Sequence, residues 1–195
     1  MVKREFTFPS ADGKTAIHAV EWLPEGAPRA VLQIAHGVSE YVLRYEDFAG
    51  YLTERGFAVV GNDHLGHGLS VADGAPRLYF GPKGSWNWVV EDMEQLRKLT
   101  HEKFPNLPYF LLGHSMGSFL TRTYLIRYPG TVDGAIIIGH RLHERRIHGG
   151  QSGRHQRRVP AKRRIQAQRR GHKSLLRHLQ PPLRPPTAQA WIGCP

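Results

Sequence analysis

The sequence predicts an α/β protein with a mostly parallel sheet, opened by an N-terminal antiparallel hairpin and covered by helices on both faces. Two observations support this fold class. Short apolar runs alternate with helical patterns from residue 30 to residue 139, and two alternating apolar–polar segments precede them. Strands that are apolar throughout are typical of parallel sheets, because helices then cover both faces.

The hairpin is expected within the first 23 residues. Arg4–Phe8 and Thr15–Leu23 both alternate apolar and polar side chains, as half-buried strands do. Between them, Ala11-Asp-Gly-Lys14 contains the Asp-Gly pair that favours a tight turn. These features predict two adjacent antiparallel strands.

Strands and helices are then expected to alternate. Apolar runs predict strands at 30–35 and 57–60, and the spacing of Tyr45, Phe48, Ala49 and Leu52 predicts a helix over 45–55 between them. Ser85 is expected to cap a helix that continues to about residue 103. Its apolar stripe is supplied by Trp88, Met93, Leu96 and Leu99.

The last three elements are a strand over 109–112, a helix over 116–127 and a strand over 133–139. No patterned strand follows residue 139, so we expect the strand at 133–139 to have an exposed edge.

A G-x-S-x-G pentapeptide joins the strand at 109–112 to the following helix. It comprises Gly113, His114, Ser115, Met116 and Gly117. In a strand–turn–helix context this pattern holds its serine in a strained turn with the hydroxyl exposed, and the glycines remove side chains that would collide there. We predict that Ser115 is a catalytic nucleophile. The alternative is an ordinary strand–helix turn that contains a serine.

An oxyanion site is expected next to this serine. In this type of elbow it is formed by the backbone N–H after the nucleophile, here Met116, and by an N–H from the loop after an earlier strand. His36-Gly37-Val38 occupies that loop, and Gly37 allows the backbone to turn, so Val38 is predicted to supply the second N–H. His36 is interpreted as an orienting residue, with no catalytic role.

The loop over 62–70 contains Asp63, His64 and His67 among glycines. It lacks the Lys-Ser/Thr order of a phosphate-binding P-loop, and its side chains do not complete a recognised metal-ligand set. We interpret the loop as structural and predict neither a metal nor a cofactor.

Charge divides the chain into two parts. Residues 1–139 carry 13 Lys or Arg and 15 Asp or Glu, a net charge of −2, whereas residues 140–195 carry 14 basic residues and one acid, a net charge of +13. The second part also lacks a sustained helical or strand period, so it is predicted to be disordered or out of frame. We therefore predict an α/β domain over 1–139 and a basic Arg/Pro/His-rich tail over 140–195.

Three motifs occur in the order found in one known superfamily: His36-Gly-Val-Ser-Glu40 with Arg44-Tyr45, then Asn62–Ser70, then Gly113–Ser118. In these segments the chain resembles the α/β-hydrolase superfamily, and within it the monoacylglycerol lipase and lysophospholipase group of the serine aminopeptidase S33 (hydrolase-4) type. The resemblance implies an α/β-hydrolase fold and an esterase acting on monoacyl lipids or related small esters. It implies Ser115 as nucleophile, with Val38 and Met116 as oxyanion donors. A serine at the elbow also argues against the dehalogenase and epoxide-hydrolase branches, which carry aspartate there.

The acid and histidine of a catalytic triad are not identified in the sequence. They should follow Ser115 in that order, yet the only later acids are Asp133, which lies too early, and Glu144, which lies in the unpatterned tail. Six histidines accompany Glu144 there, at 140, 143, 148, 155, 172 and 178, and no pattern positions a pair such as Glu144 and His172.

The family's cap and last strands also have no counterpart after residue 139. We hypothesise that residues from about 140 onward are an out-of-frame reading of a hydrolase gene. Translation of the other two frames downstream of codon 139 tests this hypothesis, which an alternate frame without the missing strands and an Asp–His pair would reject.

The expected partner is a small-molecule acyl ester or monoacyl lipid, with no specific nucleic acid. Transient contact with a membrane surface and the oligomeric state are left open. The alternative function is a noncatalytic fragment whose basic tail binds nucleic acid or an anionic membrane, although the tail lacks interleaved aromatics and an amphipathic period. The single cysteine, Cys194, excludes an internal disulfide, and neither a signal peptide nor a long apolar segment is visible, so the expected location is cytoplasmic.

Overall fold

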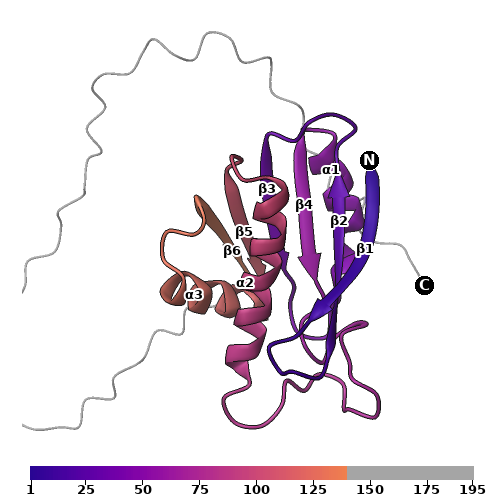
Figure 1. The fold of residues 1–195 in the computed structure, drawn as a ribbon, viewed down its shortest axis with the longest axis vertical. Coiled ribbons are helices and arrows are strands. Elements are labelled where there is room, and N and C mark those ends of the chain that lie inside the picture. The colour runs from indigo at the N-terminus through magenta and orange to yellow at the C-terminus, as the bar shows by residue number, and fades with distance from the viewer. Residues whose placement is uncertain (140–195) are drawn as a thin grey trace, which may run out of the picture. The chain divides into compact units, whose positions relative to one another are not determined.

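The computed structural model describes residues 1–139 (Figure 1). The expectations for residues 140–195, including Glu144 and the six histidines of the tail, lie outside the described residues. Within the described part, the predicted α/β fold is confirmed as a mixed sheet with an antiparallel N-terminal hairpin and a parallel core. Its strands are β1 (Val2–Pro9), β2 (Ala16–Leu23), β3 (Ala30–Ala35), β4 (Phe57–Asn62), β5 (Tyr109–His114) and β6 (Gly134–Ile138).

The strands are ordered β1-β2-β4-β3-β5-β6 across the sheet. β1 pairs antiparallel with β2, so that Val2 lies opposite Leu23, and β2 pairs antiparallel with β4. The β4–β3, β3–β5 and β5–β6 pairs are all parallel. Parallel pairing brings the carboxyl ends of β3, β4 and β5 to the same end of the sheet, and the three sequence motifs begin there.

Helices cover both faces of the sheet, because alternate strand residues point to opposite sides. Val31, Ala58 and Leu111 belong to the apolar core beneath α2 (Trp86–Lys103) and α3 (Met116–Arg127). Leu32 and Val59 belong to the opposite core, beneath the 3₁₀ helix η1 (Val42–Tyr45) and α1 (Glu46–Thr53). In Figure 1, α2 and α3 accordingly lie in front of the sheet and α1 lies behind it.

Two sequence expectations need correction. The helix expected over 45–55 is divided into η1 and α1, so helical structure begins earlier, at Val42. Ser85 precedes α2 but makes no side-chain cap hydrogen bond. Its hydroxyl donates instead to the Pro82 carbonyl oxygen, because Ser85 has helical backbone angles that do not direct its side chain to the first helical N–H groups.

β6 forms one edge of the sheet within residues 1–139, where it pairs with β5 alone. Ile136 and Ile138 on this strand are both exposed. The exposed edge expected for the strand at 133–139 is therefore present in the described part of the chain.

Candidate functional site

Ser115 occupies the sharp turn between β5 and α3. Its backbone has φ +52° and ψ −114°, a conformation that a residue with a side chain rarely adopts and that costs on the order of 1–3 kcal/mol. The turn is held from both sides: the Ser115 N–H donates to the Ile138 carbonyl oxygen of β6 at 2.9 Å, and Ser118 donates to the Ser115 carbonyl oxygen. Such strain persists only where the surrounding structure enforces it.

The two glycines of the pentapeptide leave space that a methyl group would fill. A Cβ added at Gly117 would lie 1.9 Å from the Ala35 carbonyl oxygen at the end of β3. A Cβ at Gly113 would lie 2.5 Å from the Gly117 carbonyl oxygen. The first turn of α3 therefore packs directly on the backbone of β3, and this contact sets the height of Ser115 above the sheet.

The loop after β3 lies against this turn. A Cβ added at Gly37 would lie 3.2 Å from the Ser115 Cβ, so the backbone of this loop contacts the Ser115 side chain. Among residues 1–139, no hydrogen-bond acceptor is found for the backbone N–H groups of Val38 and Met116, the predicted oxyanion donors. The structure thus places the loop that was predicted to supply an oxyanion donor against the turn at Ser115, and within residues 1–139 both predicted donors are without an acceptor.

Glu40 connects the loop to the elbow, a role that was not predicted from the sequence. Its carboxylate accepts hydrogen bonds from the Gly37 N–H at 3.1 Å and the Tyr45 hydroxyl at 2.8 Å, and it lies 3.1 Å from Nδ1 of His114. Burial acts to raise the pKa of Glu40, but the Gly37 and Tyr45 hydrogen bonds and the pairing with His114 hold that pKa below its usual value. The spacing of Gly37 and Glu40 was the available signal, but the contact with His114 depends on the fold.

His36 lies completely buried beneath the loop. Its Nδ1–H donates to the Gly37 carbonyl oxygen at 2.7 Å, and Nε2 accepts from the His64 backbone N–H at 3.0 Å. Each ring nitrogen therefore has a backbone partner that suits the neutral imidazole. Burial lowers the pKa of His36 to about 4, which keeps the ring neutral at physiological pH.

Acid should destabilise the protein through His36. The unfolded chain binds a proton on this residue below about pH 6.5, whereas the folded chain does so only below about pH 4. Unfolding therefore takes up a proton between these values, and we expect about 3 kcal/mol of stability to be lost as the pH falls through this window. Urea unfolding of the wild type and His36→Gln from pH 7 to pH 4 measures this loss.

The comparison of the two proteins isolates His36 from other titrating groups. Burial raises the pKa of Asp92 to about 6, so Asp92 favours the folded state as the pH falls, but this residue is present in both proteins. Parallel pH profiles for the wild type and His36→Gln would contradict the prediction.

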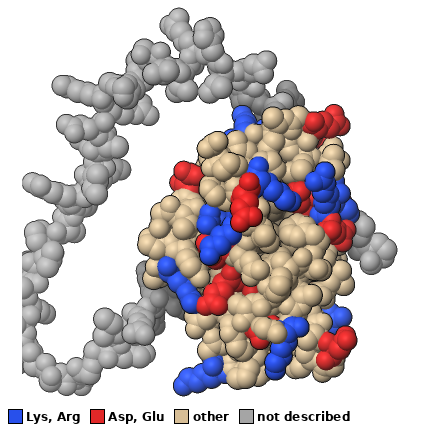
Figure 2. Space-filling view, viewed as in Figure 1, with Lys and Arg blue, Asp and Glu red and all other residues tan. Residues whose placement is uncertain are grey.

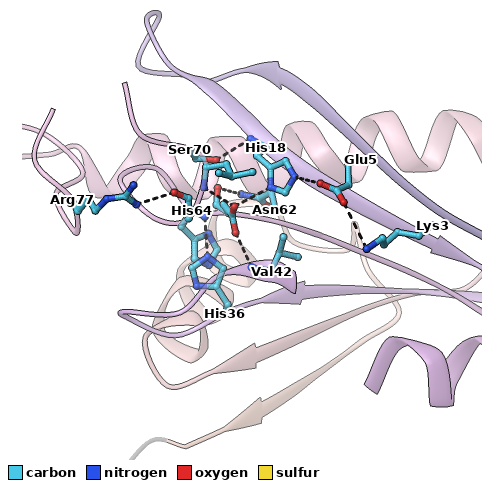
Figure 3. A network of polar contacts seen from close by, with 12 residues as sticks. Lys3, Glu5, His18, His36, Val42, Asn62, His64, Ser70 and Arg77 are labelled. Atoms are coloured by element: carbon cyan, nitrogen blue, oxygen red, sulfur yellow. Dashed lines mark hydrogen bonds and ion pairs between the residues drawn. The ribbon is translucent and has the colours of Figure 1, made fainter. Parts of the chain in front are cut away.

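The loop over 62–70 belongs to a network of polar contacts that reaches His18 and Val42 (Figure 3). The buried carboxylate of Asp63 accepts several of these contacts. Asp63 accepts from the backbone N–H groups of Val42 at 2.7 Å and Leu69 at 2.9 Å, and it lies 2.9 Å from His18 Nδ1. The other nitrogen of His18 lies 3.1 Å from Glu5, so this ring connects two carboxylates. These interactions join the loop to β1, β2 and η1.

The histidines of this loop do not converge on Asp63. The rings of His64 and His67 pack beside His36, with centroids 4.2 and 5.4 Å from it. Within residues 1–139, no group of three or more His, Cys, Asp or Glu side chains is arranged to hold a metal ion.

No general base is positioned on Ser115 by the described part of the chain. No hydrogen bond to the Ser115 hydroxyl is formed among residues 1–139, and His114, its neighbour in sequence, pairs with Glu40. Asp133 binds the Tyr109 N–H at 2.7 Å, at the opposite end of β5 from Ser115. Residues 1–139 thus hold Ser115 in a sharp turn beside two N–H groups without an acceptor, and they place no acid–histidine pair next to it.

Charges of both signs are mixed over the face that α2 and α3 cover (Figure 2). This mixture agrees with the net charge of −2 for residues 1–139 and forms no continuous basic surface on the visible face of the described part. No helix within these residues is long and apolar enough to cross a bilayer.

Comparison with known proteins identifies relatives of this chain. A family model described as serine aminopeptidase, S33 (Hydrolase_4) matches residues 26–168. The chain is 33% identical over 137 residues to a monoacylglycerol lipase of Mycolicibacterium smegmatis, covering 70% of this chain and 46% of that protein. It is also 33% identical over 117 residues to the human monoglyceride lipase, covering 60% of this chain and 37% of the relative.

Solved structures show the same relationship. A thermostable carboxyl esterase from Bacillus coagulans superimposes with a TM-score of 0.65 at 36% identity, covering 70% of this chain and 44% of the esterase. The chain therefore spans less than half the length of these proteins.

Proposed function

Since the chain belongs to the serine aminopeptidase S33 (Hydrolase_4) family of α/β-hydrolases, we propose that it is a serine hydrolase of carboxylic esters, of the monoacylglycerol lipase or lysophospholipase type. The proposed substrate is a monoacyl lipid or a related small acyl ester. The names of its relatives, which are lipases and esterases, support this reaction class.

In the proposed reaction, Ser115 Oγ attacks the acyl carbonyl carbon and loses its proton to a general base. The carbonyl oxygen becomes an oxyanion, which accepts hydrogen bonds from the N–H groups of Val38 and Met116. Collapse of the intermediate breaks the bond to the alcohol, which takes up the proton and leaves an acyl-Ser115 ester. Water then cleaves this ester by the same steps and releases the carboxylic acid.

The backbone of Ser115 is the observation that carries the proposal. Its positive φ, between a glycine that touches β3 and another that touches α3, costs conformational energy that an ordinary strand–helix turn would avoid. A catalytic role accounts for this strain, because the conformation presents the Ser115 hydroxyl at the beginning of α3, beside the N–H of Met116.

The proposal predicts covalent labelling of Ser115. We expect incubation of the full chain with p-nitrophenyl butyrate to give a butyryl ester on Ser115, because an activated ester with a good leaving group reacts without assistance to that group. Mass spectrometry of the quenched protein and its peptides measures the adduct.

Two variants control the labelling experiment. Ser115→Ala should abolish the adduct. Ser118→Ala removes a buried neighbouring hydroxyl but keeps the hydrogen bond from the Ser118 backbone N–H to the Ser115 carbonyl oxygen, so it should retain the adduct. An unlabelled wild type, or equal labelling of Ser115→Ala, would reject Ser115 as nucleophile and favour the noncatalytic alternative.

A further inference from the structure

We propose that Glu40 is a positioning residue that holds the oxyanion loop against the nucleophile elbow, so that Val38 and not Gly37 supplies the N–H of the oxyanion site. This inference rests on the proposed function. It adds a residue that lies three positions beyond Gly37 in the chain and takes no part in bond making.

The Gly37 N–H is the first step of the argument. It donates to Oε2 of Glu40 at 3.1 Å and is therefore not available to a substrate. A Cβ added at Gly37 would lie 3.3 Å from the Glu40 carboxyl carbon and 3.2 Å from the Ser115 Cβ. The Gly37 α-carbon is thus held between the carboxylate on one side and the nucleophile on the other.

The peptide between Gly37 and Val38 is anchored through its carbonyl oxygen, and the peptide before it is anchored through Glu40. Its carbonyl oxygen, that of Gly37, accepts from the His36 ring at 2.7 Å, and the preceding N–H is held by Glu40. Because a peptide group is planar, anchoring its carbonyl oxygen also fixes the direction of its N–H, which belongs to Val38. This N–H has no acceptor among residues 1–139, and Val38 is 52% exposed.

The remaining contacts of Glu40 balance its charge. A carboxylate beside a developing oxyanion would oppose the negative charge on it, unless donors compensate. The Tyr45 hydroxyl donates at 2.8 Å, and Nδ1 of His114 lies 3.1 Å away on the other oxygen. A carboxylate accepts only, so this nitrogen of His114 carries the proton. His114 precedes Ser115, and its contact with Glu40 therefore joins the loop directly to the elbow.

The test compares Ser115 acylation in the full chain across Glu40 variants, measured as p-nitrophenol release in a single turnover. Removal of one oxyanion donor typically costs about 10²-fold or more in rate, and we expect Glu40→Ala to lose acylation on this scale. Glu40→Gln, which keeps one acceptor oxygen for Gly37, should recover part of the rate.

Asp92→Ala is the matched control. Asp92 is a buried carboxylate that also accepts from a backbone N–H, that of Ala11 at 2.7 Å, and from a hydroxyl, that of Ser10 at 2.8 Å, but it lies on α2 and binds the β1–β2 turn. The Asp92→Ala variant should unfold at a lower urea concentration than the wild type, while its acylation rate stays within a few-fold of the wild-type rate. If Glu40→Ala and Asp92→Ala lose acylation equally, Glu40 affects the rate only through the overall stability of the fold, and the proposal is overturned.

Amide hydrogen exchange separates failure of this proposal from failure of the proposed function. We expect the Gly37 amide to be protected in the wild type and in Glu40→Gln, and to exchange rapidly in Glu40→Ala, whereas the Val38 amide exchanges rapidly in all three. If Ser115→Ala and the wild type show the same p-nitrophenol release, the hydrolase function fails and the exchange result alone decides whether Glu40 positions the loop. An unprotected Gly37 amide in the wild type would reject the positioning role whatever the activity.

Discussion

We expect the purified 195-residue chain to turn over p-nitrophenyl esters far more slowly than a complete relative does. Loss of a functional triad costs about 10⁴- to 10⁶-fold in kcat in serine hydrolases, and we expect a deficit on this scale against the M. smegmatis monoacylglycerol lipase in the same assay. Activation of Ser115 requires a base within hydrogen-bond reach, and residues 1–139 place none on its hydroxyl. Initial rates at saturating ester, corrected with Ser115→Ala, measure the deficit.

The residual rate is informative because the strained turn and the free N–H groups remain. Some Ser115-dependent release should persist, since oxyanion donors and binding still contribute when the triad is removed. Ser115-dependent turnover within about 100-fold of the relative would contradict the prediction, because loss of the triad costs more than this. Such a result would show that residues 140–195 supply the base, and it would reject the out-of-frame hypothesis.

Gly117→Ala should unfold or severely destabilise the protein. The added Cβ would lie 1.9 Å from the Ala35 carbonyl oxygen and 2.7 Å from that of His36. Because both are backbone atoms, no change of side-chain rotamer can remove the clash. The first turn of α3 would have to move off β3 and carry Ser115 with it. We expect a loss of about 4 kcal/mol or more, at the upper end of single substitutions. Urea unfolding followed by circular dichroism measures the change.

Gly26→Ala provides the matched control. Gly26 lies in the loop between β2 and β3, and a Cβ added there would meet no atom within 4 Å. Its unfolding free energy should stay within about 0.5 kcal/mol of the wild type, as is usual for surface substitutions. A Gly117→Ala variant as stable as Gly26→Ala would show that α3 is not fixed on β3 as described.

The sequence predicted the fold class where local patterns are strong. Period-two alternation marked β1 and β2, apolar runs marked β3 to β5, and the helix over 116–127 agrees in full with α3. Element ends were less well predicted, as η1 and Ser85 show. Val42 is buried by contacts with distant strands, and the Ser85 hydroxyl donates to the Pro82 carbonyl oxygen. Neither interaction alters the apolar periodicity from which the element ends were predicted.

The sequence by itself also determined where the sharp turn lies, because Gly113 and Gly117 stand at the two positions beside Ser115 where a Cβ would clash with backbone atoms. Only the tertiary structure decided what lies around it. Glu40 and His114 are 74 residues apart and meet because β3 and β5 pair in parallel, which brings their carboxyl ends together. The same pairing places Gly37 on Ser115. Such contacts depend on strand order and register, and residues far apart in the chain carry no local pattern that records them.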